Sequence, residues 1–306
     1  MISTVCTLFE GDHHLGVGAL FNSLYAAGFR GTLWAGYRGT IPLWALPIKE
    51  AVGYSIFHAT PDCCICFVPV VTDRHLTNYK ACFIRHVLEG LSREVSSIFY
   101  FDPDVIVRFP WKFFENWVSL SVALSEDVNS PMPDVHPKRN GWRRFFAGED
   151  IKFRNPSHYY VNGGFVGLPR ANARFLSLWE SILDTMDRKG VDLSGITRPD
   201  DYLFWNVDQD ALNIAAMATD QPMSIAGKDG MGFIPTNGPM LHAIGARKPW
   251  RCGALKHSLA GYRPTQVERE YWDNVEAPIR LFPPAKVRNA RLALGMAGLV
   301  GRFYHR

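Results

Sequence analysis

The sequence predicts an α/β protein whose sheet carries helices on its faces. Strand-like apolar segments alternate with helix-like amphipathic segments along most of the chain. The composition, with 47% hydrophobic and 20% charged residues over 306 positions, is typical of a globular protein with a sizeable core. The alternation becomes irregular beyond Met240. We therefore expect a main domain over residues 1–260 and a C-terminal extension over residues 261–306.

The first third of the chain begins with a strand, a turn and a helix. Residues 2–9 form an apolar strand-like run, residues 10–14 a polar turn, and Gly28 ends the helix that follows. The helix is predicted because its apolar residues recur on one face: Val17, Leu20, Leu24 and Ala27. Further strands are expected over 31–37, 63–71 and 98–101, with a helix over 76–91 before the last of them.

The middle of the chain predicts two more strands around a polar segment. A strand is expected over 119–124, and another, interrupted by glycines, over 159–168. The Pro-rich stretch 125–144 is too hydrophilic for a core, so we expect a mobile loop near the functional site. Pro169 opens a long helix with apolar residues at helical spacing, namely Phe175, Trp179, Ile182 and Met186. Further helices are expected over 208–219 and 287–300.

Charge, cysteine content and the N-terminus limit the class of protein. The net charge is only +4, and Lys and Arg form no stripe interleaved with aromatics, so we expect no nucleic-acid partner. The six cysteines are few for this length and are interpreted as small buried hydrophobes of a reducing compartment, with a zinc site as the alternative. The N-terminus lacks a basic region followed by an apolar one, and no run reaches the roughly 18 apolar residues of a spanning helix. A cytoplasmic location is expected.

The segment I-F-Y-F-D-P-D-V-I-V, residues 98–107, carries the strongest functional signal. An apolar strand ends at Asp102, and Pro103, which has no amide hydrogen, takes the chain out of the sheet before Asp104. Two carboxylates at a strand's C-terminal end suit a divalent cation that also holds substrate phosphates. The alternative is a turn that happens to contain two aspartates.

Two further polar motifs lie at predicted element boundaries. Asn162-Gly163-Gly164 falls within a predicted strand, where glycine indicates either a bulge or the close approach of a ligand. Asp208-Gln209-Asp210 opens a helix, where one Asp is explained by capping and by the helix dipole. Gln209 and the second Asp exceed what capping needs.

The segment L-H-A-I-G-A-R-K-P-W, residues 241–250, joins an imidazole, a glycine and a lysine. His242 added to two carboxylates shifts the expected ion from calcium toward manganese. Lys248 can then neutralise a phosphate as a point charge. Lys80, early in the helix before the D-P-D segment, is placed to reach a diphosphate, with an ordinary solvated lysine as the alternative.

This ordered set of motifs resembles the retaining glycosyltransferases of family 8, which include glycogenin and the bacterial lipopolysaccharide galactosyl- and glucosyltransferases. The resemblance spans roughly residues 2–250, and H-x-x-G-x-x-K-P-W is its most specific part. It implies the GT-A fold, a Rossmann-like mixed sheet flanked by helices. It also implies a nucleotide-diphosphate sugar donor, usually a UDP-sugar, and Mn²⁺, with Mg²⁺ as the alternative ion.

The resemblance also implies roles for individual residues. Asp102, Asp104 and His242 match the metal ligands, and Asp208, Gln209 and Lys248 match residues at the reacting centre. The full donor-binding set implied is Thr7, Leu8, Phe9, Tyr79, Lys80, Asp102, Pro103, Asp104, Asn162, Gly163, Gly164, Asp208, Gln209, His242, Gly245 and Lys248.

Three features depart from the family pattern. The family more often has Ala where this chain has Pro103. The turn Phe9-Glu10-Gly11-Asp12 does not carry the usual polar uridine-facing residues, and residues 125–158 match no family element. The base and the acceptor are therefore less well specified than the metal site.

We expect the chain to transfer a hexose, with retention, from a UDP-sugar to a hydroxyl of a glycan or glycolipid, in cell-surface polysaccharide or lipopolysaccharide synthesis. Preorganised positive charge would stabilise the leaving diphosphate. Retention requires either a covalent intermediate, for which Asp208 is the available carboxylate, or same-face attack, which we favour. The alternatives are a nucleotidyltransferase, a sugar-nucleotide hydrolase and a non-catalytic nucleotide-sugar-binding protein.

The C-terminal tail, residues 284–306, has two interpretations. Its apolar run 292–300 is about half the length that spans a bilayer, and Arg288, Arg291, Arg302 and Arg306 flank it. Such a mixture suits peripheral contact with the anionic inner face of a cell membrane. A helix packed on the catalytic domain is the alternative, and the glycines of this run count against strong insertion.

Overall fold

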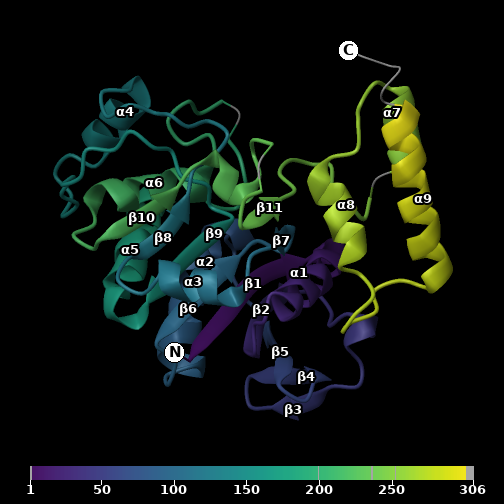
Figure 1. The fold of residues 1–306 in the computed structure, drawn as a ribbon. Coiled ribbons are helices and arrows are strands. Elements are labelled where there is room, and N and C mark those ends of the chain that lie inside the picture. The colour runs from purple at the N-terminus through teal and green to yellow at the C-terminus, as the bar shows by residue number, and fades with distance from the viewer. Residues whose placement is uncertain (1, 199, 236, 252, 301–306) are drawn as a thin grey trace.

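The computed structural model describes residues 2–198, 200–235, 237–251 and 253–300 of the 306-residue chain. Within these residues, a mixed sheet of nine strands in the order β10-β8-β9-β6-β1-β2-β5-β4-β3 runs through the centre of the molecule (Figure 1). The α/β sheet predicted from the alternation of strand-like and helix-like segments is confirmed.

The strands of this sheet are short and mostly buried. Their bounds are β1 Ser3–Glu10, β2 Gly31–Arg38, β3 Lys49–Ala51, β4 Tyr54–Thr60, β5 Cys63–Pro69, β6 Ser97–Phe101, β8 Val122–Ser125, β9 Phe165–Pro169 and β10 Met223–Ala226. A separate antiparallel pair joins β7 Val105–Val107 to β11 Met240–His242. The chain therefore leaves the main sheet between β6 and β7, at the D-P-D segment, as the proline predicts.

The helices lie on both faces of the sheet and in a C-terminal group (Figure 1). Their bounds are α1 His14–Ala26, α2 Lys80–His86, α3 Trp111–Trp117, α4 Pro137–Phe145, α5 Arg174–Arg188, α6 Val207–Ala218, α7 Ala254–Leu259, α8 Gln266–Asp273 and α9 Pro284–Val300. One predicted helix, over 76–91, is a composite: a 3₁₀ turn Leu76–Tyr79, then α2, then a π-helical turn Val87–Leu91.

Strand directions bring several functional segments to one edge of the sheet. β1 is parallel to β2 and to β6, whereas β9 is antiparallel to both β6 and β8. The C-terminal ends of β1, β6 and β8 therefore lie beside the N-terminal end of β9. Glu10 is the last residue of β1, Asp102 follows β6, and residues 162–164 precede β9. These positions therefore meet at this edge of the sheet.

Alternating side chains build two apolar layers, one on each face of the sheet. Leu8, Ile98 and Tyr100 pack against the face covered by α2, α5 and α6. Phe9, Phe99 and Phe101 pack against the face covered by α1 and α3. Because both faces are buried, these strands are apolar at nearly every position, which explains the continuous hydrophobic runs in the sequence.

The C-terminal helices form a third apolar cluster that reaches the main domain. Tyr271 and Trp272 of α8 share this cluster with Leu294 and Ala297 of α9 and with Ala19 of α1. In Figure 1, α8 lies between α1 and α9 at one end of the sheet. The division of the chain at residue 260 stays a prediction, although α7, before that point, packs on α9.

Several elements were not predicted from the sequence, among them the β3–β4 hairpin, α3 and β10. The β3–β4 hairpin over 49–60 has an exposed outer edge, so its apolar alternation is weak. The helix α3 has seven residues, too short for a clear helical period. The strand β10 is half-exposed throughout and pairs only with β8 at the end of the sheet.

The expectation of a hydrophilic mobile loop near the functional site over 125–144 was wrong for its second half, which is helical, whereas residues 127–129 do line a cleft at the edge of the sheet. This segment contains α4, whose Trp142 and Arg139 are fully buried. Arg139 donates to the backbone carbonyls of Met132 and Tyr159, and Lys138 pairs with Asp210. The polar residues are therefore internal ion-pair and hydrogen-bond partners, which hydrophilicity alone does not distinguish from a solvated loop.

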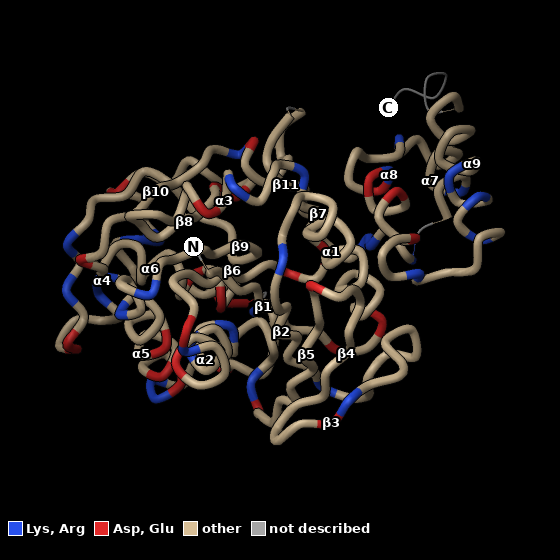
Figure 2. The backbone as a smooth tube through the Cα atoms, turned by 60° about the horizontal axis from the view of Figure 1, so that its bottom comes forward, with Lys and Arg blue, Asp and Glu red and all other residues tan. Residues whose placement is uncertain are grey.

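Both signs of charge are distributed over the described chain, with acidic and basic positions interspersed around the sheet and the C-terminal helices (Figure 2). Among the helices that the structure describes, none combines the length and the hydropathy needed to cross a membrane.

Candidate functional site

A cleft of about 790 Å³ opens where the strand ends meet. Its floor comes from the end of β1, the D-P-D turn after β6 and the Asn162-Gly163-Gly164 turn before β9. Its walls come from the start of α6 and from the segment that follows β11. Segments distant in sequence therefore supply one pocket at the carboxyl edge of the sheet.

Asp102, Asp104 and His242 form the centre of the cleft. Each offers one ligand atom, and these atoms lie within 4.8 Å of one another; no other such group occurs in the described residues. The His242 Nε2 lies 3.2 Å from Asp104 Oδ1 and 3.8 Å from Asp102 Oδ2. Imidazole and carboxylate ligands that converge in this way fit a divalent ion such as Mn²⁺.

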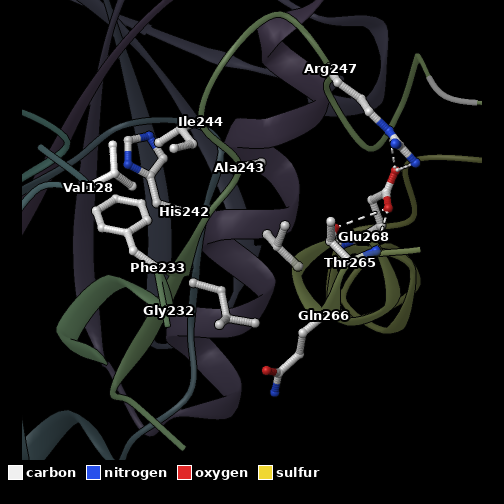
Figure 3. Close-up of a pocket in the computed structure, with 12 residues that line it drawn as sticks. Val128, Gly232, Phe233, His242, Ala243, Ile244, Arg247, Thr265, Gln266 and Glu268 are labelled. Carbon is white, nitrogen blue, oxygen red and sulfur yellow. Dashed lines mark hydrogen bonds and ion pairs between the residues drawn. The ribbon is translucent and has the colours of Figure 1, made fainter. Parts of the chain in front are cut away.

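β11 places the imidazole opposite the D-P-D turn. His242 pairs with Val105 across the short β7–β11 ladder, and the amide of Ala243 donates to the carbonyl of Asp104. The ring also faces Phe233 at 6.1 Å between centroids, on the wall of a second, smaller pocket (Figure 3). The backbone pairing thus sets the distance between the imidazole and the carboxylates.

Gly164 leaves the space that the imidazole occupies. A Cβ built there would lie 2.5 Å from Cε1 and 2.8 Å from Nδ1 of His242. The predicted strand over 159–168 was wrong in its first part: β9 begins only at Phe165, and Asn162 to Gly164 form a turn. In that turn the Gly164 amide donates to Asn162 Oδ1 and the Lys80 ammonium donates to the Gly163 carbonyl. Side chains of this chain thus lie close to both glycines, and the close approach of a ligand to them stays a prediction.

Asp104 is held ionised by its neighbours. It is buried, and burial raises its pKa, but His242 and Lys248 outweigh that effect and hold the pKa well below its usual range. The Lys248 ammonium pairs with Asp104 and also donates to the Ala243 carbonyl at 2.8 Å. A permanent anion therefore faces the cleft beside a lysine.

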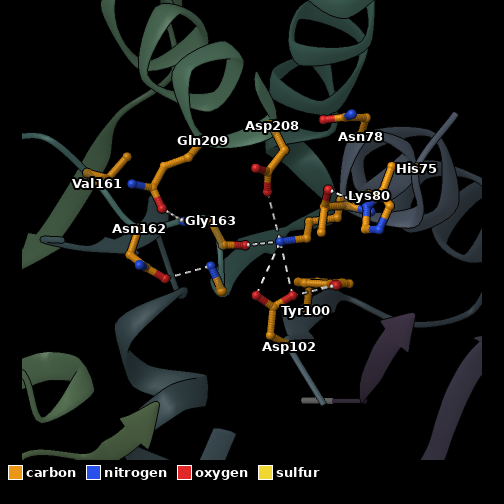
Figure 4. Close-up of polar contacts among 12 residues, drawn as sticks. His75, Asn78, Lys80, Tyr100, Asp102, Val161, Asn162, Gly163, Asp208 and Gln209 are labelled. Atoms are coloured by element: carbon orange, nitrogen blue, oxygen red, sulfur yellow. Dashed lines mark hydrogen bonds and ion pairs between the residues drawn. The ribbon is translucent and has the colours of Figure 1, made fainter. Parts of the chain in front are cut away.

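Lys80 is a second buried cation under the cleft (Figure 4). Its ammonium lies 3.0 Å from Asp102 Oδ1 and 3.0 Å from Asp208 Oδ2, and donates to the Gly163 carbonyl at 2.9 Å. Burial lowers its pKa, but the two carboxylates outweigh burial and raise it. The alternative of a solvated lysine was wrong, because Lys80 is only 1% exposed.

The start of α6 supplies polar groups rather than a conventional cap. Asp208 points to Lys80, and Gln209 Oε1 accepts from the Gly163 amide at 3.1 Å. The side chain of the N-cap residue Asn206 makes no capping hydrogen bond. Its backbone amide donates to Asp210 Oδ2 at 3.1 Å. Within the D-Q-D motif, Asp210 therefore caps the helix, whereas Asp208 and Gln209 line the cleft.

Most of the predicted donor-binding residues lie in this cleft, and two do not. Leu8, Phe9, Lys80, Asp102, Pro103, Asp104, Asn162, Gly163, Gly164, Asp208, Gln209, His242, Gly245 and Lys248 all line it. Thr7 is fully buried inside β1. Tyr79 lines a separate surface pocket with Cys82 and Arg85.

The structure adds residues that the sequence reasoning did not select. Glu10, His13 and His75 line the cleft beside the end of β1, and Asp12 closes its rim through an ion pair with Arg251. Asp127 follows β8 and accepts from Asn162 Nδ2 at 2.6 Å. Its position directly after a predicted strand was the available signal, since that is where an α/β sheet places its site residues.

The described cysteines, Cys6, Cys63, Cys64, Cys66 and Cys82, are free, and Cys252 lies outside the described residues. Burial raises the pKa of the Cys6 thiol well above its usual value. Three of the five are buried, as expected for small core hydrophobes.

A comparison with models of known families gives no match. A comparison with curated protein sequences gives none either. Among solved structures, the chain is similar to the apo structure of WbbM, a bifunctional glycosyltransferase, with a TM-score of 0.54 and 14% identity over 95% of this chain. The chain spans about half the length of that structure, 52%. The likeness shows the fold: a GT-A mixed sheet flanked by helices, as the resemblance implied.

Proposed function

We propose that this protein is a metal-dependent retaining glycosyltransferase, related to family 8, that moves a hexose from a UDP-sugar to a hydroxyl of a glycan or glycolipid. The observation that carries the proposal is the convergence of Asp102, Asp104 and His242 in a cleft that also contains the ammonium groups of two lysines and the Gln209 carboxamide. The fold shared with a glycosyltransferase supports the same class of reaction.

Asp102, Asp104 and His242 would hold the divalent ion, with Mn²⁺ the expected choice and Mg²⁺ the alternative. When bound, such an ion supplies Lewis-acid stabilisation of the diphosphate. The Tyr100 hydroxyl donates to Asp102 Oδ1 at 2.8 Å and Lys80 holds the same carboxylate, so the ligand is oriented before any ion arrives.

Lys248 would supply positive charge where negative charge grows on the leaving diphosphate. Its ammonium rests on Asp104 within the cleft, at the end of a segment that begins with Gly245 in a left-handed conformation, φ 79°. Fixed charge of this kind needs no reorganisation during reaction, which is why it lowers the barrier by several kcal/mol in comparable sites.

Asp208 and Gln209 would line the sugar pocket. Asp208 already neutralises Lys80, so a free carboxylate nucleophile is less available there than its position alone suggests. We therefore retain same-face transfer, in which the donor phosphate takes the acceptor proton. The neutral Gln209 amide, fixed through the Gly163 amide, is suited to a hydrogen bond with a sugar hydroxyl.

The expected pathway is cell-surface polysaccharide or lipopolysaccharide synthesis in the cytoplasm. We also propose that the C-terminal tail contacts a membrane peripherally. The helix α9 buries Val287, Leu294 and Ala297 and exposes Leu292, Met296 and Leu299. One face of α9 thus packs on the protein, and the other is available to the inner face of a membrane near basic residues visible in Figure 2. Arg302 and Arg306 lie outside the described residues.

Donor turnover separates this proposal from its rivals. Released UDP should appear when the chain is incubated with Mn²⁺ and a panel of UDP-sugars, and an added glycan acceptor should raise the rate and appear as a glycosylated product. Release of UMP and a sugar phosphate would indicate a diphosphatase, and formation of UTP and a sugar phosphate on addition of pyrophosphate would indicate a nucleotidyltransferase. UDP binding by calorimetry without turnover of any donor would indicate a binding protein.

A further inference from the structure

The segment 243–251 after β11 contacts the cleft with some side chains and the C-terminal helices with others. Lys248 faces the cleft, where its ammonium pairs with Asp104. Arg247, its neighbour, points the opposite way toward α8, across a separate pocket of about 280 Å³ (Figure 3). We call residues 243–251 the lysine segment.

The polar anchor of the lysine segment is an ion pair with a buried carboxylate. Arg247 places Nε at 2.9 Å and Nη2 at 2.8 Å from Glu268 Oε1. The other oxygen, Oε2, accepts from the Thr265 amide at 2.7 Å in the capping box that starts α8. Glu268 is only 3% exposed. A buried carboxylate needs such partners, so the pair ties the segment firmly to the start of α8.

An apolar anchor lies three residues further along. The Trp250 ring packs against Tyr271 of α8 at 5.5 Å between centroids and against His13 at 5.4 Å. It also lies over Gly16, where a Cβ would come within 2.9 Å of the indole and 2.2 Å of the Pro103 carbonyl. The indole is thus fitted between α1, the D-P-D turn and α8. Lys248 stands between these two anchors.

Residues 244–246, between β11 and Arg247, make few contacts with the rest of the protein. Gly245 has φ 79°, and a Cβ placed there would meet nothing within 4 Å. Ile244 is 42% exposed. A segment with few internal contacts depends on its ends for order, because fixing each residue otherwise costs conformational entropy.

We propose that Arg247 and Glu268 are positioning residues: through their ion pair, α8 of the C-terminal extension holds Lys248 over the metal and diphosphate site. Nothing in the sequence motif assigns this task to α8. The role of Lys248 in turnover rests on the proposed function, whereas the anchoring of residues 243–251 does not. The extension is therefore a working part of the cleft and not merely a packed addition to it.

A double-mutant cycle tests whether Glu268 acts through Lys248. In the full chain with Mn²⁺, UDP release from UDP-glucose and UDP-galactose is measured for Glu268→Gln, Lys248→Ala and the double variant. We expect Glu268→Gln alone to lower kcat about tenfold, and to lower it less than about twofold when Lys248 is already Ala. Equal losses in both backgrounds would mean that Glu268 acts only on general stability, and would overturn the proposal.

Hydrogen exchange tests the anchoring without any donor. Amide exchange of residues 243–251 should accelerate about tenfold in Glu268→Gln, and in Arg247→Gln if the first variant does not fold. Glu276→Gln is the matched control, because it removes the exposed Glu276–Arg291 ion pair of the same extension and should leave this exchange unchanged. Unchanged exchange in Glu268→Gln would overturn the inference. Absent donor turnover in the wild-type chain would instead count against the proposed function.

Discussion

Gly164 and His242 illustrate how the candidate site depends on single residues. The imidazole can approach the two carboxylates because the residue beneath it has no side chain. The same turn is fixed by Asn162, whose amide nitrogen donates to Asp127 and whose oxygen accepts from Gly164. Residues in the turns beside β6, β8 and β9 and at the end of β11 are thus joined by direct contacts, so their relative positions are set before a ligand binds.

The Lys248→Ala variant should lower turnover more than it weakens UDP binding. Its proposed partner is charge that develops on the leaving diphosphate, so the loss belongs mainly to the transition state. We expect kcat for donor cleavage to fall about a hundredfold, with a change of less than about fivefold in the Kd for UDP in Mn²⁺. Lys256→Ala, at an exposed position of α7, is the control.

If UDP affinity and turnover fell by the same factor, Lys248 would bind the diphosphate equally well in the ground state and in the transition state, which would contradict the proposed role. Kinetics across a UDP-sugar panel and calorimetry with UDP would be measured on the same preparations, so that a folding defect is detected in both.

Several residues selected from the sequence lie together in the structure, although their roles stay predictions. Asp102, Asp104, His242 and Lys248 meet in the cleft, because the D-P-D turn follows β6 and the β7–β11 ladder brings His242 and the segment after it to the same place. Tyr79 does not line the cleft, since the 3₁₀ turn at 76–79 turns its side chain to the other side of α2. Asp127 was not selected because it occurs within a segment whose polarity indicated a loop.

At the scale of elements, Asp210 at the start of α6 forms an ion pair with Lys138 of α4, and neither residue lines the cleft. Asp210 is fully buried, lies 2.7 Å from the Lys138 ammonium of α4 and accepts from the Tyr160 hydroxyl at 2.7 Å. Burial raises the pKa of Asp210 to about 6, although Lys138, Tyr160 and the Asn206 amide each lower it. This trio fastens α4 to α6.

Stability should therefore fall as pH rises through the range in which Asp210 titrates. The unfolded chain releases this proton near pH 4 and the folded chain near pH 6, so the folded state binds more protons in between and loses stability as pH increases. Relative to Asp210→Asn, wild-type unfolding free energy should decline by up to about 3 kcal/mol over this window and stay level above it.

Urea denaturation of both chains from about pH 4 to pH 7.5 measures this difference. Tyr160→Phe removes a hydrogen bond that favours ionised Asp210, so the pKa of Asp210 in the folded state should rise. The upper limit of the pH window over which stability declines should therefore move upward. A difference between wild type and Asp210→Asn that is the same at both ends of the range would show that Asp210 does not titrate there.

Elements that were predicted correctly have a strong period or a strong stop signal. The strand β1, the body of the helix α5 and the break at Pro103 are of this kind. The predicted start of that helix at Pro169 was wrong, because Pro169 ends β9 and α5 begins at Arg174 after a 3₁₀ turn. α4 was missed because its buried face includes Lys138 and Arg139, which the pattern of apolar residues cannot reveal. The edge strands β3 and β10 were missed because they are partly exposed and gain their order from neighbouring strands.

At the scale of the whole molecule, the C-terminal helices pack on the α/β domain. The helices α8 and α9, together with α7, share an apolar cluster with α1, and the Asn22 amide of α1 donates to the carbonyls of Asn274 and Ile279 at 2.8 Å each. The alternative of a helix packed on the core is therefore realised by one face of α9. The other face remains available for membrane contact.

Membrane contact should depend on the exposed face of α9. The variant Leu292→Ser/Met296→Ser/Leu299→Ser keeps the buried face intact and should reduce co-sedimentation with phosphatidylglycerol vesicles by about tenfold or more. Leu259→Ser, on an exposed position of α7, should bind like wild type. Equal binding by the triple variant and wild type would leave α9 as part of the fold only.

The most direct test of the central claim is a crystal of the chain grown with Mn²⁺ and UDP, analysed by anomalous scattering at the manganese edge. We predict one manganese peak with ligand atoms of Asp102, Asp104 and His242 at about 2.0–2.6 Å, beside the diphosphate. Lys248 should then lie on the diphosphate rather than on Asp104. A bound nucleotide with no manganese at this position, or with His242 directed away from it, would contradict the account.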